Sequence, residues 1–153
     1  MTTSSDSTPE TLHACRYEQL PWLPWAMKGA YFKLLNADPA SGRFTLLIKL
    51  DKGIAGPMHR HVRAVEGLVL EGGFHYLDDP GRSFTAGCYL HEADGAVHQP
   101  VSPTGAIMFA VFHGPVEGLD EEGRVTGRID CGWHVETWNA HERIHSPKNA
   151  PEK

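Results

Sequence analysis

The sequence predicts an all-β protein, built as a sandwich or a barrel. Gly and Pro account for 16 and 11 of the 153 residues and are spread along the chain, which leaves little room for helices. The stretches between these residues are short and separated by turn sequences, as all-β sandwiches and barrels require. A composition of 41% hydrophobic and 22% charged residues is that of a globular domain with a real core.

Individual strands are predicted from alternation and from apolar runs. In the segment 43–50, Phe44, Leu46, Ile48 and Leu50 alternate with their neighbours, a period of two that gives a strand one apolar face. Turn residues occur at 36–39, 79–81 and 102–105. Further strands are expected at 65–70, 74–77, 88–90, 107–113 and 124–131, and the segment 133–146 is the one place for a helix of ordinary length.

The chain is expected to form one domain between two polar ends. We predict a flexible N-terminal tail at 1–16, a β domain at 17–138 and a polar C-terminal segment at 139–153. The first 16 residues lack the basic and apolar regions of a secretory signal. The longest apolar run, 106–112, is far shorter than the ~20 residues of a membrane-spanning helix. A cytoplasmic location is therefore expected.

Charge and cysteine content narrow the classes of partner. The formal net charge is −5 and the chain has no run of Lys or Arg, so nucleic acids and anionic membranes are not expected as partners. Cys15, Cys88 and Cys131 are odd in number and far apart. They are interpreted as free thiols in a reducing compartment.

The segment 53–73, GIAGPMHRHVRAVEGLVLEGG, carries the clearest functional pattern. His59 and His61 are two residues apart, so on a strand both imidazoles project from the same face. Glu66 follows five residues later, and His98 comes after a turn at Gly95. Three imidazoles and a carboxylate that converge in a β domain suit a divalent metal such as Fe(II), Mn(II), Ni(II) or Zn(II).

This pattern resembles the two motifs of the cupin (RmlC-like) superfamily. The first, G(X)5HXH(X)4E(X)6G, is matched at every spacing, from Gly53 to Gly73. The second, G(X)5PXG(X)2H(X)3N, is matched at Gly87, Gly95 and His98, with Ala93 in place of Pro and Ser102 in place of Asn. The resemblance implies a single cupin barrel, which is a double-stranded β-helix or jelly roll.

Within the cupins, the chain resembles the group of 2,4'-dihydroxyacetophenone dioxygenase and acetylacetone-cleaving dioxygenase. The resembling pieces are the LPW segment near residue 20, FTLLIKLDKG, GGFHYLDD, AGCYLHEADGAVH and FHGPVEGLDEEGRV. The resemblance implies a mononuclear non-haem Fe(II) held by His59, His61 and His98, with Glu66 as a candidate fourth ligand. It also implies oxidative C–C cleavage of a small diketone or hydroxyketone by O₂. Ni(II) or Zn(II) can occupy such a site instead.

Residues that the motifs do not specify are predicted to surround the metal site. Glu92, six residues before His98, matches a glutamate near the substrate entrance of the β-diketone enzyme and is the catalytic candidate; the alternative is a solvated carboxylate at a strand end. Trp25, Tyr76, Phe109 and Phe112 are available to line a pocket for an aromatic ketone. The remaining histidines are interpreted as wall or surface residues (His75, His91 and His113) and as surface residues near the ends (His13, His134, His141 and His145).

Two other functions remain open. A metal-binding sensor or regulator would resemble the zinc cupin domain of ChrR-like anti-sigma factors, and a sugar isomerase or epimerase on a similar barrel is the third alternative. The expected partners of the enzyme are a small carbonyl substrate and O₂. Pairing through edge strands would give a homodimer or a homotetramer.

Overall fold

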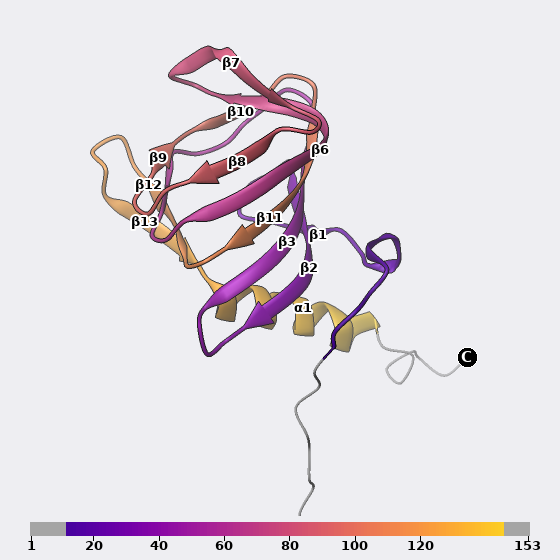
Figure 1. Cartoon of the computed structure of the whole chain (residues 1–153). Coiled ribbons are helices and arrows are strands. Elements are labelled where there is room, and N and C mark those ends of the chain that lie inside the picture. The colour runs from indigo at the N-terminus through magenta and orange to yellow at the C-terminus, as the bar shows by residue number, and fades with distance from the viewer. Residues whose placement is uncertain (1–11, 146–153) are drawn as a thin grey trace, which may run out of the picture.

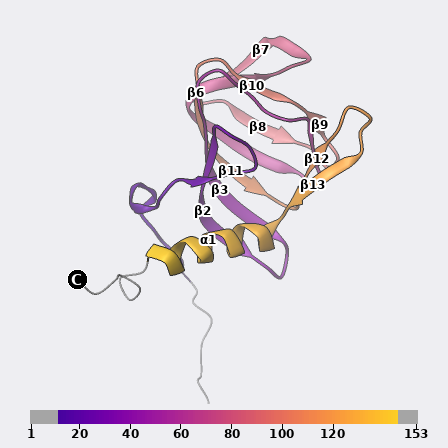
Figure 2. The same ribbon diagram turned by 180° about the vertical axis from the view of Figure 1, so that it is seen from behind.

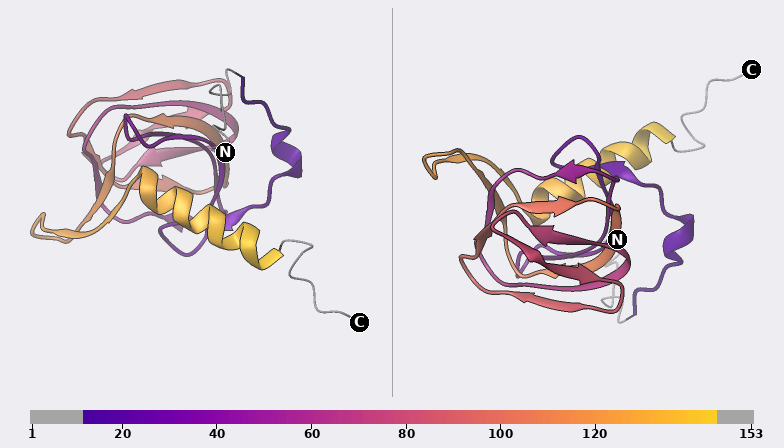
Figure 3. Two further views of the ribbon diagram at one scale, coloured as in Figure 1. Left: turned by 90° about the horizontal axis from the view of Figure 1, so that it is seen from below. Right: turned by 90° about the horizontal axis from the view of Figure 1, so that it is seen from above.

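The structure is a computed structural model that describes residues 12–145. Its strands form two antiparallel sheets that curl around a common interior, with one helix outside (Figures 1 and 3). The elements are η1 Tyr17–Gln19, β1 Leu23–Pro24, β2 Ala30–Asp38, β3 Arg43–Leu50, β4 Ile54–Ala55, β5 His59–His61, β6 Val65–Tyr76, β7 Asp79–Thr85, β8 Tyr89–Glu92, β9 Val97–His98, β10 Pro100–Ser102, β11 Ala106–Phe112, β12 Val116–Leu119, β13 Val125–Ile129 and α1 Cys131–His145.

The larger sheet has the order β1-β2-β3-β11-β6-β10-β4, and β7 and β8 also pair with β6. The smaller sheet has the order β13-β12-β5-β9 and contains the strands that carry the three motif histidines. Strands far apart in the chain are therefore neighbours, as in a double-stranded β-helix. The all-β barrel predicted from the sequence is confirmed.

Most predicted strands are present, and the alternation at 43–50 corresponds to β3. The predicted strands at 65–70 and 74–77 are joined in one strand, β6, which has a register shift against β11 between Ile107 and Met108. Because Val69 pairs with Met108 and Glu71 with Ile107, Leu70 is an extra residue on β6. Such a bulge changes which side chains face inward.

The sequence analysis missed β1, β2, β4, β7, β10 and β12. It placed one turn three residues too early, at 36–39 instead of 39–42, and a second turn two residues too late. The second turn lies at 77–78, and the predicted turn residues 79–81 belong to β7. Within the described residues β7 pairs with β6 alone, so it is an edge strand. Pro80 is tolerated there because its missing N–H is not needed by a second neighbour.

The core fills the interior of the barrel and the space between β2 and α1. Its buried apolar side chains are Leu23, Phe32, Phe44, Leu46, Ile48, Val65, Ala110, Phe112, Val116 and Cys131. The helix lies across one end of the ring of strands (Figures 2 and 3). Trp133 and Trp138 of α1 pack against Phe32 of β2, which attaches the helix to the barrel.

The predicted helix at 133–146 is confirmed, as Cys131–His145. It runs through the predicted boundary between 138 and 139, so the residues on both sides of that boundary belong to one helix. The prediction that the histidines near the ends are surface residues is wrong for His134. It is fully buried, accepts a hydrogen bond from Trp25 Nε1 at Nε2 and donates one from Nδ1 to the Asp130 carbonyl.

The ends of the predicted layout fall partly outside the described residues, namely at 1–11 and 146–153. Residues 12–16 form neither helix nor strand, and the ring of His13 contacts the Leu35 carbonyl at 2.9 Å. The three cysteines are free, as predicted. No helix of the described segment 12–145 is long and apolar enough to cross a membrane.

Candidate metal centre

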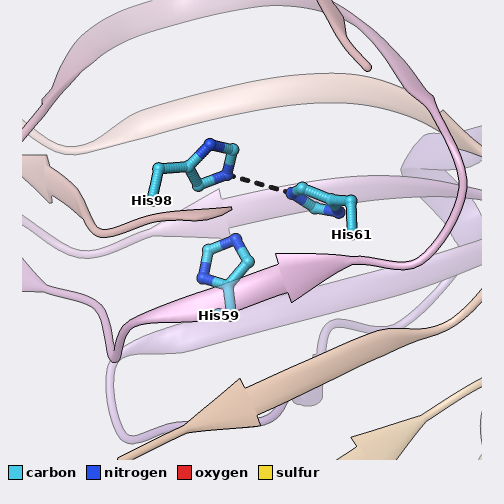
Figure 4. A group of neighbouring side chains, drawn as sticks. All are labelled: His59, His61 and His98. Carbon is cyan, nitrogen blue, oxygen red and sulfur yellow. Dashed lines mark hydrogen bonds between the residues drawn. The ribbon is translucent and has the colours of Figure 1, made fainter. Parts of the chain in front are cut away.

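His59 and His61 lie on β5 and His98 lies opposite them on β9. His59 pairs with His98 across the sheet, and the two-residue spacing puts His61 on the same inner face. The Nε2 atoms of His61 and His98 are 3.0 Å apart, and each of the three rings offers a nitrogen within 4.8 Å of the other two (Figure 4). The structure therefore brings the three predicted histidines together.

The spacing and hydrogen bonding of these rings fit a bound metal. Two nitrogens bound at right angles to one ion, each at ~2.1 Å, lie about 3.0 Å apart. His59 Nδ1 donates to the Pro57 carbonyl at 3.0 Å, which leaves its Nε2 free to bind. A backbone acceptor on the second nitrogen is the usual support of a ligating histidine. Among the described residues, the buried His61 Nδ1 has no hydrogen-bond partner.

Burial keeps the imidazoles of His59 and His98 neutral, the form that binds metal. Burial, aided by the neighbouring His61, lowers the pKa of His59 to about 4. The pKa of His98 is also lowered by burial, although the carboxylate of Glu92 opposes the shift. At neutral pH both rings can therefore offer a lone pair without first losing a proton.

Glu92, the predicted catalytic residue, is the carboxylate that reaches the centre. Its Oε2 lies 3.0 Å from His61 Nε2 and its Oε1 lies 3.6 Å from His98 Nε2. The hydroxyl of Tyr76 donates to Glu92 Oε1, and the Tyr76 ring stacks on His98 at 4.2 Å between centroids. Burial by itself would raise the pKa of Glu92, but the contact with His61, together with His98 and Tyr76, holds it at about 2.

Glu66 is not brought to the three histidines, which corrects the prediction of a fourth ligand at this position. Val65 and Val69 of β6 are buried, so by alternation Glu66 projects to the outer face of the strand. Its side chain is 46% exposed and contacts Tyr89 at 2.7 Å and His113 at 3.3 Å. Glu66 is close to His59 and His61 in the sequence, but its side chain points to the opposite face of the sheet from the histidines.

Two cavities meet at the histidines. We define the inner chamber as the space of about 80 Å³ between the candidate metal centre and strands β3, β6 and β11. Its lining at the metal centre consists of His59, His61, His98, Tyr76 and Glu92. The outer cavity has about 540 Å³ and is lined by β12, β13, the segment 54–57 and Trp133. The two spaces adjoin at the candidate metal centre, because both are lined by His59 and His61 and also by Trp25, Leu50 and Pro100.

Glycines make room for the outer cavity beside His59. Gly118 of β12 pairs with His59 on one side and with Gly127 of β13 on the other. Cross-strand partners project to the same face, so this row has no side chain beyond His59. A Cβ at Gly127 would meet nothing within 4 Å. A Cβ at Gly118 would meet Thr126 Oγ1 at 2.9 Å, so the open space in this row lies at Gly127.

Other predicted pocket residues are partly confirmed. Trp25 lines both cavities, and Tyr76 and Phe112 line the inner chamber. Phe109 lines neither, because it alternates with the inward-facing Ala110 on β11. His113 binds Glu66 on the outer face, as expected of a wall histidine.

The sequence analysis did not find the role of Tyr76 or the walls of the outer cavity. Tyr76 faces inward because the bulge at Leu70 shifts the alternation of β6, so that Phe74 and Tyr76 take the inner face. Without the bulge, His75 would do so. Trp133 of α1 and Ile54 reach the cavity through tertiary packing, and no local pattern marks them.

An antiparallel barrel with three inward histidines on neighbouring strands defines this protein as a cupin with a candidate metal site. The chain belongs to the family described as the ChrR cupin-like domain, which it matches over residues 10–117. A comparison with curated protein sequences found no significant match.

Solved structures agree with the fold. An RmlC-like cupin protein of Ralstonia eutropha JMP134 has a TM-score of 0.80 at 22% identity, with 86% of this chain and 88% of that chain covered. An acetylacetone dioxygenase of Acinetobacter johnsonii has a TM-score of 0.74 at 21% identity, with 92% and 98% covered. The anti-sigma factor ChrR of Rhodobacter sphaeroides, solved with SigE, has a TM-score of 0.52 at 24% identity, with 63% and 50% covered.

Proposed function

We propose that this protein is a mononuclear metal-dependent dioxygenase, with Fe(II) as its metal, that cleaves a C–C bond in a small diketone or hydroxyketone. The observation that carries the proposal is the set of three converging histidines at the meeting point of two cavities. Three protein ligands with accessible space beside them are typical of a catalytic metal, whereas a structural site is closed by four. Likeness to the Acinetobacter johnsonii acetylacetone dioxygenase supports the choice of substrate class.

His59, His61 and His98 would hold the metal, which when bound supplies Lewis acidity towards a ketone with two oxygens and a site for O₂. Three imidazole ligands bring no negative charge to the ion, which favours an anionic enolate as a further ligand. Glu92 Oε2, at 3.0 Å from His61 Nε2, is positioned to take the proton that the enol releases and pass it to solvent, because a carboxyl group with a pKa of about 2 does not retain it at neutral pH. Tyr76 keeps the carboxylate in that position.

The apolar walls of the outer cavity would bind the body of the ketone. Trp25, Trp133 and Ile54 line it, and a volume of about 540 Å³ is within the ~300–1,000 Å³ range of small-molecule sites. These walls also exclude water from the reacting carbon. The proposed substrate is therefore a ketone with an aromatic or aliphatic body.

The test is O₂ consumption by protein loaded anaerobically with Fe(II), measured with a panel of diketones and hydroxyacetophenones. Uptake that depends on Fe(II) and on one class of ketone is expected. His98→Ala should remove it, while the matched change His91→Ala, on an exposed side chain of β8, should not. Absence of uptake with the whole panel, in protein that binds one Fe(II), would contradict the proposal.

A second function, a zinc-binding regulator, is favoured by the ChrR family match and by the position of Glu92. A carboxylate next to two of the three histidines is able to complete a closed set of four ligands. In that case X-ray absorption of the Zn(II) protein would show three nitrogens and one oxygen from the chain, and added diketone would leave the spectrum unchanged. A spectrum that changes with diketone would favour the enzyme.

A further inference from the structure

The two cavities that meet at the candidate metal centre differ in size, and we propose that they take different reactants. The inner chamber admits a small apolar gas, O₂, and the outer cavity holds the ketone. This assignment rests on the proposed dioxygenase function. It adds a gas-binding chamber on the β6 and β11 side of the centre.

The volumes of the two cavities determine which reactant each can hold. An engineered protein cavity of ~150 Å³ is about the size that binds benzene or xenon. The inner chamber, at about 80 Å³, is too small for an aryl ketone but has room for a diatomic molecule. The outer cavity, at about 540 Å³, has room for the ketone.

The chemistry of the inner walls agrees with this division. Away from the centre, the chamber is lined by side chains without hydrogen-bonding groups: Ile48, Val65, Phe74, Met108, Ala110 and Phe112. A ketone oxygen placed there would lose its hydrogen bonds to water without gaining others. An uncharged apolar gas has no such cost, so the walls select for it.

The polar groups of the chamber are all at the centre. The polar side chains that line the chamber lie beside the predicted metal and are those of His59, His61, His98, Glu92 and Tyr76. The Trp25 indole also lines the chamber, but its N–H is already bonded to His134. A gas molecule in the chamber is therefore adjacent to the histidines. The ketone occupies the space on the β12 and β13 side, so the two reactants do not compete for one cavity.

Xenon is the first probe, because it reports an apolar gas site without turnover. Crystals of the Ni(II)-loaded protein under xenon pressure should show one xenon atom in the inner chamber. Ala110→Val, which adds two methyl groups inside the chamber, should remove it; Ala30→Val, a matched change in the outer cavity, should keep it. Xenon bound only in the outer cavity, or at neither site, would overturn the proposal.

Steady-state kinetics then separate the reactants. Ala110→Val should raise the KM for O₂ about tenfold with an unchanged KM for the ketone, and Ala30→Val should do the reverse. Wild-type O₂ uptake with no effect of Ala110→Val on the KM for O₂ would overturn this inference and leave the proposed function intact. No wild-type uptake would instead contradict the proposed function, while xenon still tests the chamber.

A second variant covers the case in which Ala110→Val does not fold. Val65 is buried and lines the inner chamber but not the outer cavity. Val65→Ala enlarges the chamber and should raise xenon occupancy at the same pressure. Unchanged occupancy, in protein with normal circular dichroism and one bound Ni(II), would count against a gas site there.

Discussion

Among single residues, two glutamates show how the face of a strand decides a role. Glu66 satisfies the spacing of the first cupin motif, yet it projects outward to Tyr89 and His113. Glu92 occupies a position that the second cupin motif leaves unspecified, yet it lies 3.0 Å from His61. The carboxylate beside the three histidines therefore comes from β8.

Glu66→Gln should bind one Ni(II) or Zn(II) with unchanged affinity, because its side chain contacts no ligand. His98→Ala should weaken binding by more than ~100-fold, since losing even a supporting partner of a ligand costs about 10–100-fold. Isothermal titration with each metal measures both. A large loss of affinity in Glu66→Gln would show that this carboxylate does reach the metal.

Glu92→Gln should lower kcat by roughly 10²–10⁴-fold, the usual contribution of a positioned proton acceptor. The amide keeps the shape and the contact with Tyr76 but cannot take up the enol proton. Metal content, checked by elemental analysis, should stay at one Fe(II) per chain. If metal is lost together with activity, Glu92 is a ligand of the ion instead.

Among the elements, α1 is joined to the barrel by a buried histidine. The His134 ring stacks on Phe44 with 4.3 Å between centroids, and its two nitrogens are used by Trp25 and the Asp130 carbonyl. Nδ1 carries the proton and Nε2 accepts, so the neutral ring satisfies both partners. A second proton would set an N–H against the Trp25 N–H, and burial lowers the pKa of His134 to about 4.

This histidine should make stability depend on pH. Its pKa is lowered from 6.5 in the unfolded chain to about 4 in the folded one, so the unfolded state binds the extra proton between these values. The contribution is fully present above pH 6.5 and decreases by roughly 3 kcal/mol as the pH falls to 4. His59 and His98 act in the same direction in metal-free protein.

His134→Gln isolates the part due to His134. Its free energy of unfolding, measured in urea at the same metal loading, should change less steeply between pH 6.5 and 4, by about 1.4 kcal/mol per pH unit. The variant should also be less stable at pH 7 because packing on Phe44 is lost. Equal slopes in the two proteins would contradict a neutral buried His134.

For the whole molecule, the centre connects segments that are far apart in the chain. β5 and β9 are separated by the long strand β6 and by β7 and β8, and the metal would bind to both. Because the unfolded chain does not hold these ligands together, metal binding is coupled to folding.

Metal at about 100 times its Kd should therefore add about 2.7 kcal/mol of stability. For a chain of this size, that is a rise in Tm of about 5–10 °C. Differential scanning calorimetry with and without Ni(II) measures the shift, and a chelator should reverse it. A similar rise in His98→Ala would indicate binding elsewhere.

The fold class and the pair of His59 and His61 were predictable from local patterns, and His98 was predicted through the resemblance to the second cupin motif. Turn residues at short intervals and the alternation of β3 predict a β barrel, and the HXH pair needs only one strand to share a face. Tyr76 and Trp133 were not predictable as site residues. Their positions depend on a bulge in β6 and on the packing of α1, neither of which a local pattern records.

The sequence by itself determined the class of the protein: an all-β cupin with three histidines able to meet at one point. The tertiary structure decided which carboxylate lies beside the three histidines, how large each cavity is, and that His134 is buried in the core. The physical reason is that a two-residue period fixes the relative faces of near neighbours. Register between distant strands, bulges and helix packing decide which face becomes the interior.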